Sequence, residues 1–294
     1  MPLTFPSHLA PVLPLKLWRP RWFDGVALAT GAVSPDVAYL FTGTGIELGG
    51  HTHTAGGVLW WGLPVALVYA WIVRRTVAGI AVHLPLDRLF AWRDHAALGA
   101  VRHPWQVTVC SALIGAASHV LWDRATHTER WLRLVGIEDF HAHTGMYWWF
   151  FSDLVSTAVG GVVVVALALR TARRGEIFQG VRPPPPPARP AVFWGVALPV
   201  TAAGATVLPL LPAATVAAPA GVRLLHLAAL ALIAGAPRRE RFPSPGRPLA
   251  GRDALRRNSV NPGSCVTRTC RISGLVSITF GGAPECLSER GSAA

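Results

Sequence analysis

The chain has 294 residues, of which 51% are hydrophobic and only 14% are charged, and its mean hydropathy is +0.39. This composition is too apolar for an ordinary soluble domain and is typical of an integral membrane protein. The net charge of +12 includes arginine doublets beside hydrophobic runs, and the sequence does not indicate an aromatic-interleaved basic groove. The charge therefore argues against a nucleic-acid-binding protein and favours arginines that orient the chain in a membrane.

The N-terminal region lacks a continuous apolar run, because Pro6, Pro11 and Pro14 interrupt it. We therefore expect no cleavable signal peptide. The next apolar stretch, residues 26–41, carries Asp36 within the letters SPD. We expect it to form an N-terminal interfacial helix that packs at the membrane surface or only partly enters the bilayer.

Five later stretches approach the roughly 17–25 apolar residues that a transmembrane helix needs. They cover residues 56–73, 105–122, 146–169, 191–214 and 222–236. The sequence therefore predicts an all-α fold, a polytopic helical bundle with about five transmembrane helices over residues 1–236. Residues 237–294 are rich in proline and arginine at first and contain none of the 12 tryptophans, so we expect a disordered C-terminal tail there.

Basic residues predict the orientation, because positively charged loops stay on the cytoplasmic side. Residues 74–103 and 170–189 hold five arginines each, which assigns both stretches to the cytoplasm. The opposite side receives Lys16, Arg19 and Arg21 before the first span and Arg124, Arg130 and Arg133 after the second.

The stretch SHVLWDRATHTERW places His119, Asp123 and His127 four residues apart. In a helix these three side chains share one face and are separated by about 6 Å per step along the axis. Imidazole nitrogen and carboxylate oxygen are ligands that suit zinc, manganese, iron or nickel. The first and third side chains are roughly 12 Å apart and cannot both reach one ion, so other segments must contribute.

The predicted topology brings more histidines to this side of the membrane. Seven of the eleven are assigned there: His8, His51, His53, His119, His127, His141 and His143. Structural roles without a metal also stay open. His119 and Asp123 could form a hydrogen-bonded pair within the helix, and Asp36 could cap a helix or turn. Asp153 in the third span is an intramembrane carboxylate that could be functional or could reach the interface.

Four sequence elements, TFPSHLAPVLPL, GAVSPDVAYL, HTHTAGG and SHVLWDRATH, together resemble a bacterial family of small polytopic membrane proteins of unknown function (DUF4184-like). That family is distantly similar to the YdjM-type membrane-bound metal-dependent hydrolases. The resemblance covers residues 1–236 and implies metal ligands at six positions: His8, Asp36, His53, His119, Asp123 and His127. The third element reads THT in place of an ending in serine, which keeps a hydroxyl at Thr54.

The resulting hypothesis is a membrane-bound metal-dependent hydrolase with a divalent ion, zinc or manganese. It would act on a lipid-linked or other phosphoester at the outer face of the bacterial inner membrane, with Asp36 or Glu129 as the base. Two alternatives stay open: a non-catalytic protein that binds or transports a divalent metal, and a structural membrane scaffold. The expected partner is the lipid bilayer and not nucleic acid, and the oligomeric state is left open. The chain has no Gly-rich phosphate loop, no G-x-S-x-G element and no H-E-x-x-H motif.

Overall fold

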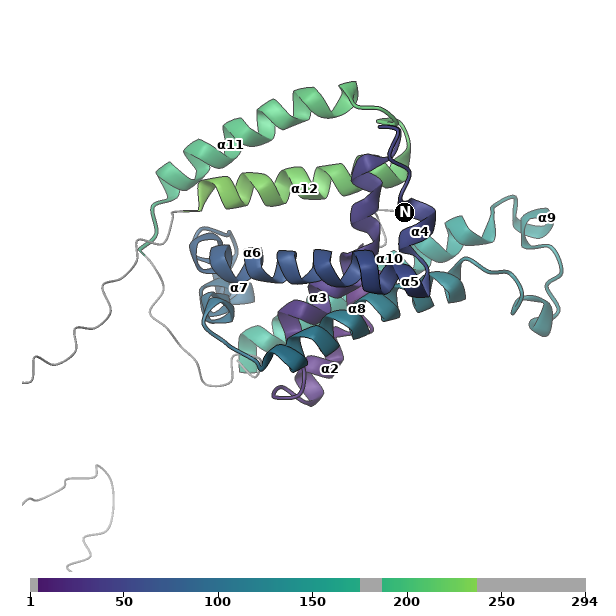
Figure 1. Ribbon diagram of the computed structural model, residues 1–294, viewed down its shortest axis with the longest axis horizontal. Coiled ribbons are helices and arrows are strands. Elements are labelled where there is room, and N and C mark those ends of the chain that lie inside the picture. The colour runs from purple at the N-terminus through teal and green to yellow at the C-terminus, as the bar shows by residue number, and fades with distance from the viewer. Residues whose placement is uncertain (1–4, 175–186, 237–294) are drawn as a thin grey trace, which may run out of the picture. The chain divides into compact units, whose positions relative to one another are not determined.

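The computed structural model describes residues 5–174 and 187–236, which form helices and connecting turns without strands (Figure 1). The longer elements are α3 (Gly25–Val33), α6 (Leu63–Ala81), α8 (Trp105–Thr126), α10 (Trp148–Arg174), α11 (Pro190–Val207) and α12 (Ala217–Gly235). The shorter elements that precede or connect them are α1 (Phe5–Leu9), α2 (Leu13–Trp18), η2 (Pro35–Phe41), α4 (Gly49–Thr52), α5 (Ala55–Gly57), η3 (Val58–Gly62), α7 (Asp87–Phe90), η4 (Trp92–Gly99), η5 (Arg133–Val135), α9 (Phe140–Thr144) and η7 (Leu208–Leu210). The predicted disordered tail, residues 237–294, lies outside the described residues.

Four helical segments of the described chain are long and apolar enough to cross a membrane: Ala55–Ala81, Trp148–Arg173, Pro190–Leu210 and Ala217–Gly235. They match four of the five predicted spans. The remaining predicted span, residues 105–122, forms α8. This helix is long enough to cross a membrane, but it is more polar and is not among the four. The prediction of an all-helical, multi-pass membrane protein is confirmed.

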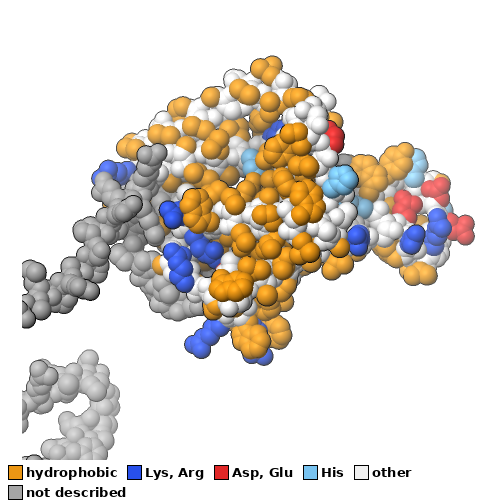
Figure 2. Space-filling view, viewed as in Figure 1, with side chains coloured by type: hydrophobic (Ala, Val, Ile, Leu, Met, Phe, Trp, Pro, Cys, Tyr) orange, Lys and Arg blue, Asp and Glu red, His pale blue; other side chains and the backbone are white. Residues whose placement is uncertain are grey.

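The surface of these helices is apolar, as expected for contact with lipid. Only 11–28% of each span is buried within the protein. Val68, Val162 and Leu198 are 53%, 70% and 60% exposed, and Figure 2 shows hydrophobic side chains over much of the visible face. Exposing this much apolar surface to water would be unfavourable, so the helices belong in a lipid bilayer.

α6 continues past the pair of arginines that was predicted to end the first span. The guanidinium of Arg74 forms an ion pair with Asp24, and that of Arg75 lies 4.7 Å from the ring centre of Trp71. These partners satisfy both cations, and the helix ends only at Ala81.

Small residues let α3 and α8 pack with their backbones nearly touching. A Cβ atom added to Gly31 would lie 2.2 Å from the Ala112 carbonyl oxygen, and one added to Gly115 would lie 2.3 Å from that of Leu28. Such contacts are the usual way in which membrane helices approach closely. His119 lies one turn after Gly115, so this contact determines where the His119 ring meets α3.

A similar contact holds α1 against α10. A Cβ atom on Gly160 would lie 2.6 Å from the backbone of Ser7, whereas one on the neighbouring Gly161 would meet nothing within 4 Å. Ser7 directly precedes His8. The glycine in the third predicted span therefore determines the position of a side chain near the N-terminus.

At the beginning of α3, a buried carboxylate ties three helices together. Asp24 is 2% exposed and caps α3, with the Ala27 amide donating to its Oδ1 at 3.3 Å. Arg74 of α6 pairs with the same carboxylate, and the Thr108 hydroxyl of α8 donates to it at 2.7 Å. The Asp24 amide donates to Ser111 Oγ at 2.9 Å. We call Asp24, Arg74, Thr108 and Ser111 the Asp24 cluster.

The position of Lys16 corrects the predicted topology. Its ammonium donates to the carbonyls of Pro20 and Phe23, and it lies 3.2 Å from Nε2 of His103. The segment from Lys16 to Asp24 therefore packs beside Arg74 and the start of α8, at the end of the bundle that was assigned to the cytoplasm. The prediction that placed Lys16, Arg19 and Arg21 on the opposite side is wrong, because α2 and α3 run from the His8 end to this end and back.

The stretch predicted as an interfacial helix, residues 26–41, forms two elements, α3 and η2, which join at Ser34. Leu28 and Ser34 are fully buried, and α3 packs against α6, α8 and α1. Because α3 runs from the Asp24 cluster to Ser34, its end and the following η2 turn deliver Asp36 to the end of α8 where His119 lies.

Candidate metal centre

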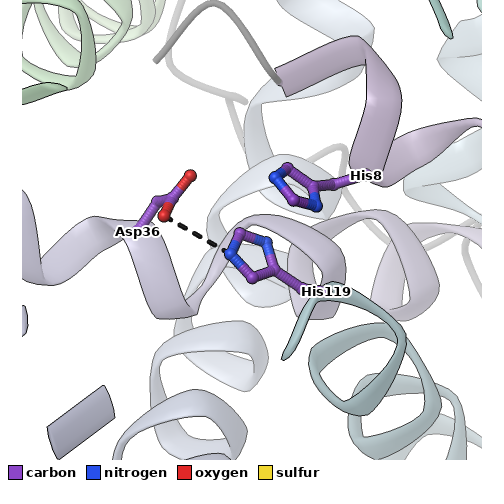
Figure 3. A group of neighbouring side chains, drawn as sticks. All are labelled: His8, Asp36 and His119. Carbon is purple, nitrogen blue, oxygen red and sulfur yellow. Dashed lines mark ion pairs between the residues drawn. The ribbon is translucent and has the colours of Figure 1, made fainter. Parts of the chain in front are cut away.

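Five polar side chains from separate segments converge beside the C-terminal half of α8. We call them the donor cluster: His8 from α1, Asp36 from η2, His53 at the end of α4, and His119 and Asp123 from α8. All five were candidate ligands from the sequence. Figure 3 shows how His8, Asp36 and His119, which are far apart in the chain, point toward one another.

The distances within the cluster are those of ligands that share an ion. Nε2 of His53 and Nε2 of His119 lie 3.3 Å apart. Oδ2 of Asp123 lies 3.5 Å and 3.3 Å from these two atoms, and Oδ1 of Asp36 lies 3.2 Å and 3.4 Å from them. Two ligands bound tetrahedrally at about 2.0–2.1 Å to one zinc ion are separated by roughly 3.3 Å. Either carboxylate oxygen therefore forms, with the two Nε2 atoms, a triangle with the dimensions of one face of a tetrahedral zinc site.

Backbone carbonyls determine which ring nitrogens carry protons. Nδ1 of His119 lies 2.7 Å from the Ala32 oxygen, and Nδ1 of His53 lies 2.9 Å from the Gly49 oxygen. A carbonyl oxygen only accepts hydrogen bonds, so both Nδ1 atoms donate, and each Nε2 faces the carboxylates. Burial would lower the pKa of His119, but Asp36 and Asp123 outweigh burial and raise this pKa to about 10, so without a metal ion His119 carries a proton on Nε2 as well. Two Nε2 atoms and two carboxylates thus face one another, and either the proton on His119 or a bound cation offsets the carboxylate charge.

The local sequence explains why His53 reaches Asp36. Thr52 is fully buried, and its hydroxyl donates to the Pro35 carbonyl at 3.2 Å, which places the two following residues side by side. A Cβ atom on Gly57 would lie 2.5 Å from the Thr52 oxygen. Only a glycine lets the start of the first span approach the His53 turn this closely.

His8 covers one side of the cluster. Its ring stacks on that of His119 with centres 3.7 Å apart, and its Nε2 lies 3.5 Å from Oδ1 of Asp123. His8 is 3% exposed, and burial, together with the neighbouring His119, lowers its pKa from 6.5 to about 3. The ring is therefore neutral at physiological pH and can act as a ligand.

The Asp36 carboxyl is ionised in this environment. Burial alone would raise its pKa, but His119 and His53 beside it outweigh burial and hold the pKa well below its usual value. The carboxylate form, which is the form that binds metal, is therefore present at neutral pH.

The structure places the remaining two candidate residues differently. Nε2 of His127 lies 2.9 Å from Oδ1 of Asp153, and the groups of the described residues that could hold an ion do not include His127. This hydrogen bond raises the pKa of His127. Glu129 is exposed in the turn after α8 and is not among the residues that line the cavity described next. The partnership between His127 and Asp153 was missed, although a carboxylate inside a span is itself a sign that a partner exists.

A cavity of about 810 Å³ opens onto the donor cluster. His8, Asp36, His53 and Asp123 contribute to its wall. The other lining residues are Tyr39, Thr42, Glu47, Gly49, Gly50, His51, Val120, Arg124, His127 and Thr128. The cavity thus joins candidate ligands to hydroxyl, imidazole and guanidinium groups that could contact a polar molecule. His141 and His143, on the exposed helix α9, do not line it.

Comparisons with known proteins identify the family alone. Neither a curated protein nor a solved structure matches the chain. A family model described as Domain of unknown function (DUF4184) matches residues 1–236. This range includes the four candidate spans found among the described residues and the donor cluster, and the chain belongs to the DUF4184 family.

Proposed function

We propose that the protein is a membrane-bound, metal-dependent hydrolase that cleaves a lipid-linked or other phosphoester. In this proposal a divalent ion, zinc or manganese, is held by His53 and His119 together with Asp123 or Asp36. His8 packs against the site and supports Asp123.

One observation carries the metal assignment: the donor cluster places two partly buried carboxylates around two imidazole Nε2 atoms. Both imidazole Nδ1 atoms donate to carbonyl oxygens, so Nε2 of His53 and Nε2 of His119 face two carboxylates at 3.2–3.5 Å. The proton that the raised pKa of His119 implies balances only one of the two carboxylate charges. Leaving the remaining negative charge in a site this enclosed is costly. A divalent ion in place of the proton would balance both carboxylates, with one of them as its ligand.

The ligand set also favours catalysis over a purely structural ion. Two histidines and one carboxylate leave a fourth position for water or substrate, which is the pattern of hydrolytic zinc sites. An ion held there would polarise a phosphoryl oxygen and lower the pKa of water. The cavity beside the cluster supplies room for a substrate. The distant similarity of the family to YdjM-type metal-dependent hydrolases, which is an expectation from the sequence, would point in the same direction.

The surroundings support an anionic, membrane-associated substrate. Arg124 is exposed in the cavity wall one residue after Asp123, where its cation can contact a phosphate. The cluster lies at the ends of apolar helices, where a lipid headgroup would be found. Because Lys16, Arg19 and Arg21 pack with the predicted cytoplasmic loops, the positive charge at that end supports an outward-facing cluster.

The first test is the metal content of the purified protein in mild detergent, measured by elemental mass spectrometry after incubation with zinc or manganese. We expect about one ion per chain in the parent, and much less in a folded His53→Asn variant. His51→Asn is the matched control, because His51 lines the same cavity but lies outside the donor cluster. Absence of metal from the parent would indicate instead that a proton on His119 satisfies the acceptors and that the cluster is a structural scaffold.

The second test is turnover. The metal-loaded parent is expected to release inorganic phosphate from phosphatidic acid or from 4-nitrophenyl phosphate. Stoichiometric metal without hydrolysis of any phosphoester would favour the alternative of a non-catalytic protein that binds or transports the ion.

A further inference from the structure

We propose that His127 is the proton-transferring residue of this site, held in place by Asp153, and is not a metal ligand. The inference rests on the proposed hydrolase and assigns a role that the donor cluster itself cannot perform. The proposal gives His127 a different role from His119 and Asp123, although the three residues are spaced four apart in the sequence.

Geometry separates His127 from the ligands. His127 directly follows the last residue of α8, four residues after Asp123, and lines the same cavity. Its Nε2 is engaged with Oδ1 of Asp153 at 2.9 Å. A carboxylate accepts this hydrogen bond, so Nε2 carries a proton and Nδ1 is the nitrogen that can exchange a proton with a substrate.

Asp153 and His127 differ in exposure. A group that orients its partner is expected to be buried, and a group that reacts with a substrate is expected to be accessible. The side chain of Asp153 is 7% exposed within the span of α10, whereas that of His127 is 36% exposed in the cavity wall. A second contact fixes the same junction, since the Ser152 hydroxyl donates to the Thr126 carbonyl at 2.8 Å. Adjacent residues of α10 therefore hold adjacent residues at the end of α8, which limits the movement of the imidazole.

The sequence candidates for the base are less suitable. Asp36 Oδ1 lies 3.2 Å and 3.4 Å from the Nε2 atoms of His53 and His119, so it belongs with the ligands. Glu129 is exposed outside the cavity wall. His127 lines the cavity, is oriented by Asp153 and lies outside the donor cluster.

The step balances with water as the only co-reactant. Water adds to phosphorus, the bond between phosphorus and the ester oxygen breaks, and the leaving oxygen takes the proton from Nδ1 of protonated His127. The proton released by the attacking water restores the imidazolium. The products are an alcohol and inorganic phosphate, and Asp153 keeps its charge and stabilises the imidazolium throughout.

The test compares His127→Asn with His51→Asn, whose side chain lines the same cavity but lies outside the donor cluster. Two substrates are used: phosphatidic acid, with a poor alkoxide leaving group, and 4-nitrophenyl phosphate, with a good one. We expect His127→Asn to keep its metal, to lose about 100-fold or more in kcat on phosphatidic acid, and to lose much less on 4-nitrophenyl phosphate, because a good leaving group needs no proton. His51→Asn should change both rates by the same factor, because a loss of binding contact does not depend on the leaving group.

Asp153 acts through His127 and is a positioning residue. Asp153→Asn is expected to give the same leaving-group pattern with a smaller loss, and His127→Gln provides a second variant if His127→Asn does not fold. Loss of metal from folded His127 variants would show that His127 is a ligand and would overturn this inference while leaving the hydrolase intact. Equal losses on both substrates with the metal retained would also overturn it. A metal-loaded parent that hydrolyses neither substrate would overturn the proposed function itself, and this inference with it.

Discussion

The two ends of α3 and α8 both bury charged side chains, but in opposite ways. At one end, the Asp24 carboxylate has a cation, Arg74, and a hydroxyl donor, Thr108. At the other end, two carboxylates face the Nε2 atoms of two imidazoles, whose charge depends on a bound proton. The first cluster is neutralised by a permanent cation, whereas the second is neutralised only by an added proton or metal ion.

The two clusters also differ in how accessible they are from outside the protein. Asp24 is 2% exposed and closed in by three helices, whereas the donor cluster borders a cavity of about 810 Å³. The comparison teaches that burial of charge alone does not identify a functional site. The useful signs are the balance of donors and acceptors and a path to the outside.

The largest effect is expected from breaking the complete cluster. Arg74→Met leaves the Asp24 carboxylate buried without its cation, which costs about 3–5 kcal/mol of unfolding free energy. Thermal unfolding in detergent measures this loss. The double variant Asp24→Asn, Arg74→Met should recover most of it, since neither buried charge remains. Metal per folded chain should stay unchanged in both variants, and a selective loss of metal would mean that the two clusters are not separate in function.

A smaller effect is expected from displacing α1. Gly160→Ala places a Cβ atom 2.6 Å from the backbone of Ser7, and such overpacking costs about 1–3 kcal/mol. The displacement should also weaken metal binding, because His8 moves with Ser7. Gly161→Ala is the control in the next position, where the added atom meets nothing within 4 Å. Equal behaviour of the two variants would show that α1 is not held by this contact.

The pH dependence of stability tests the burial of neutral His8. Its pKa of about 3 lies below the ordinary 6.5, so the unfolded chain takes up a proton between these values and the folded chain does not. Stability should therefore fall on acidification, by about 2 kcal/mol between pH 7 and pH 5 for this group. Chemical denaturation of metal-free protein measures the slope, and His8→Gln should remove that share. An unchanged slope in the variant would contradict the assignment.

The smallest effect is expected from Glu129→Gln. Glu129 is exposed and outside the cavity wall, so stability should change by no more than about 0.5 kcal/mol and turnover by less than about twofold. A large loss of turnover with normal metal content would return Glu129 to the role of base and would weaken the case for His127.

The membrane architecture was largely predictable because it depends on local properties. Length and hydropathy identified four spans that the structure contains, and the helical period placed His119 and Asp123 on one face. The extension of α6 past Arg74 was not predictable in this way. It depends on Asp24, which lies 50 residues earlier in the chain.

The composition of the candidate site was predicted in part. His8, Asp36 and His53 were named from the family resemblance, but the sequence gives no distances between them. Their convergence depends on contacts between distant segments, including Thr52 with Pro35 and Ser7 with Gly160. Regular spacing also grouped His127 with His119, although a partner on α10 gives it a different environment.

By itself the sequence determined that the chain is a helical membrane protein and which polar residues are unusual in so apolar a chain, because hydropathy and helical period are properties of neighbouring residues. Only the tertiary structure decided which of these residues share a site and which are neutralised elsewhere. It also decided that Lys16 lies beside His103, at the end of the bundle away from His8. The physical reason is that charge balance and donor geometry depend on atoms a few ångströms apart in space, whatever their separation in the chain.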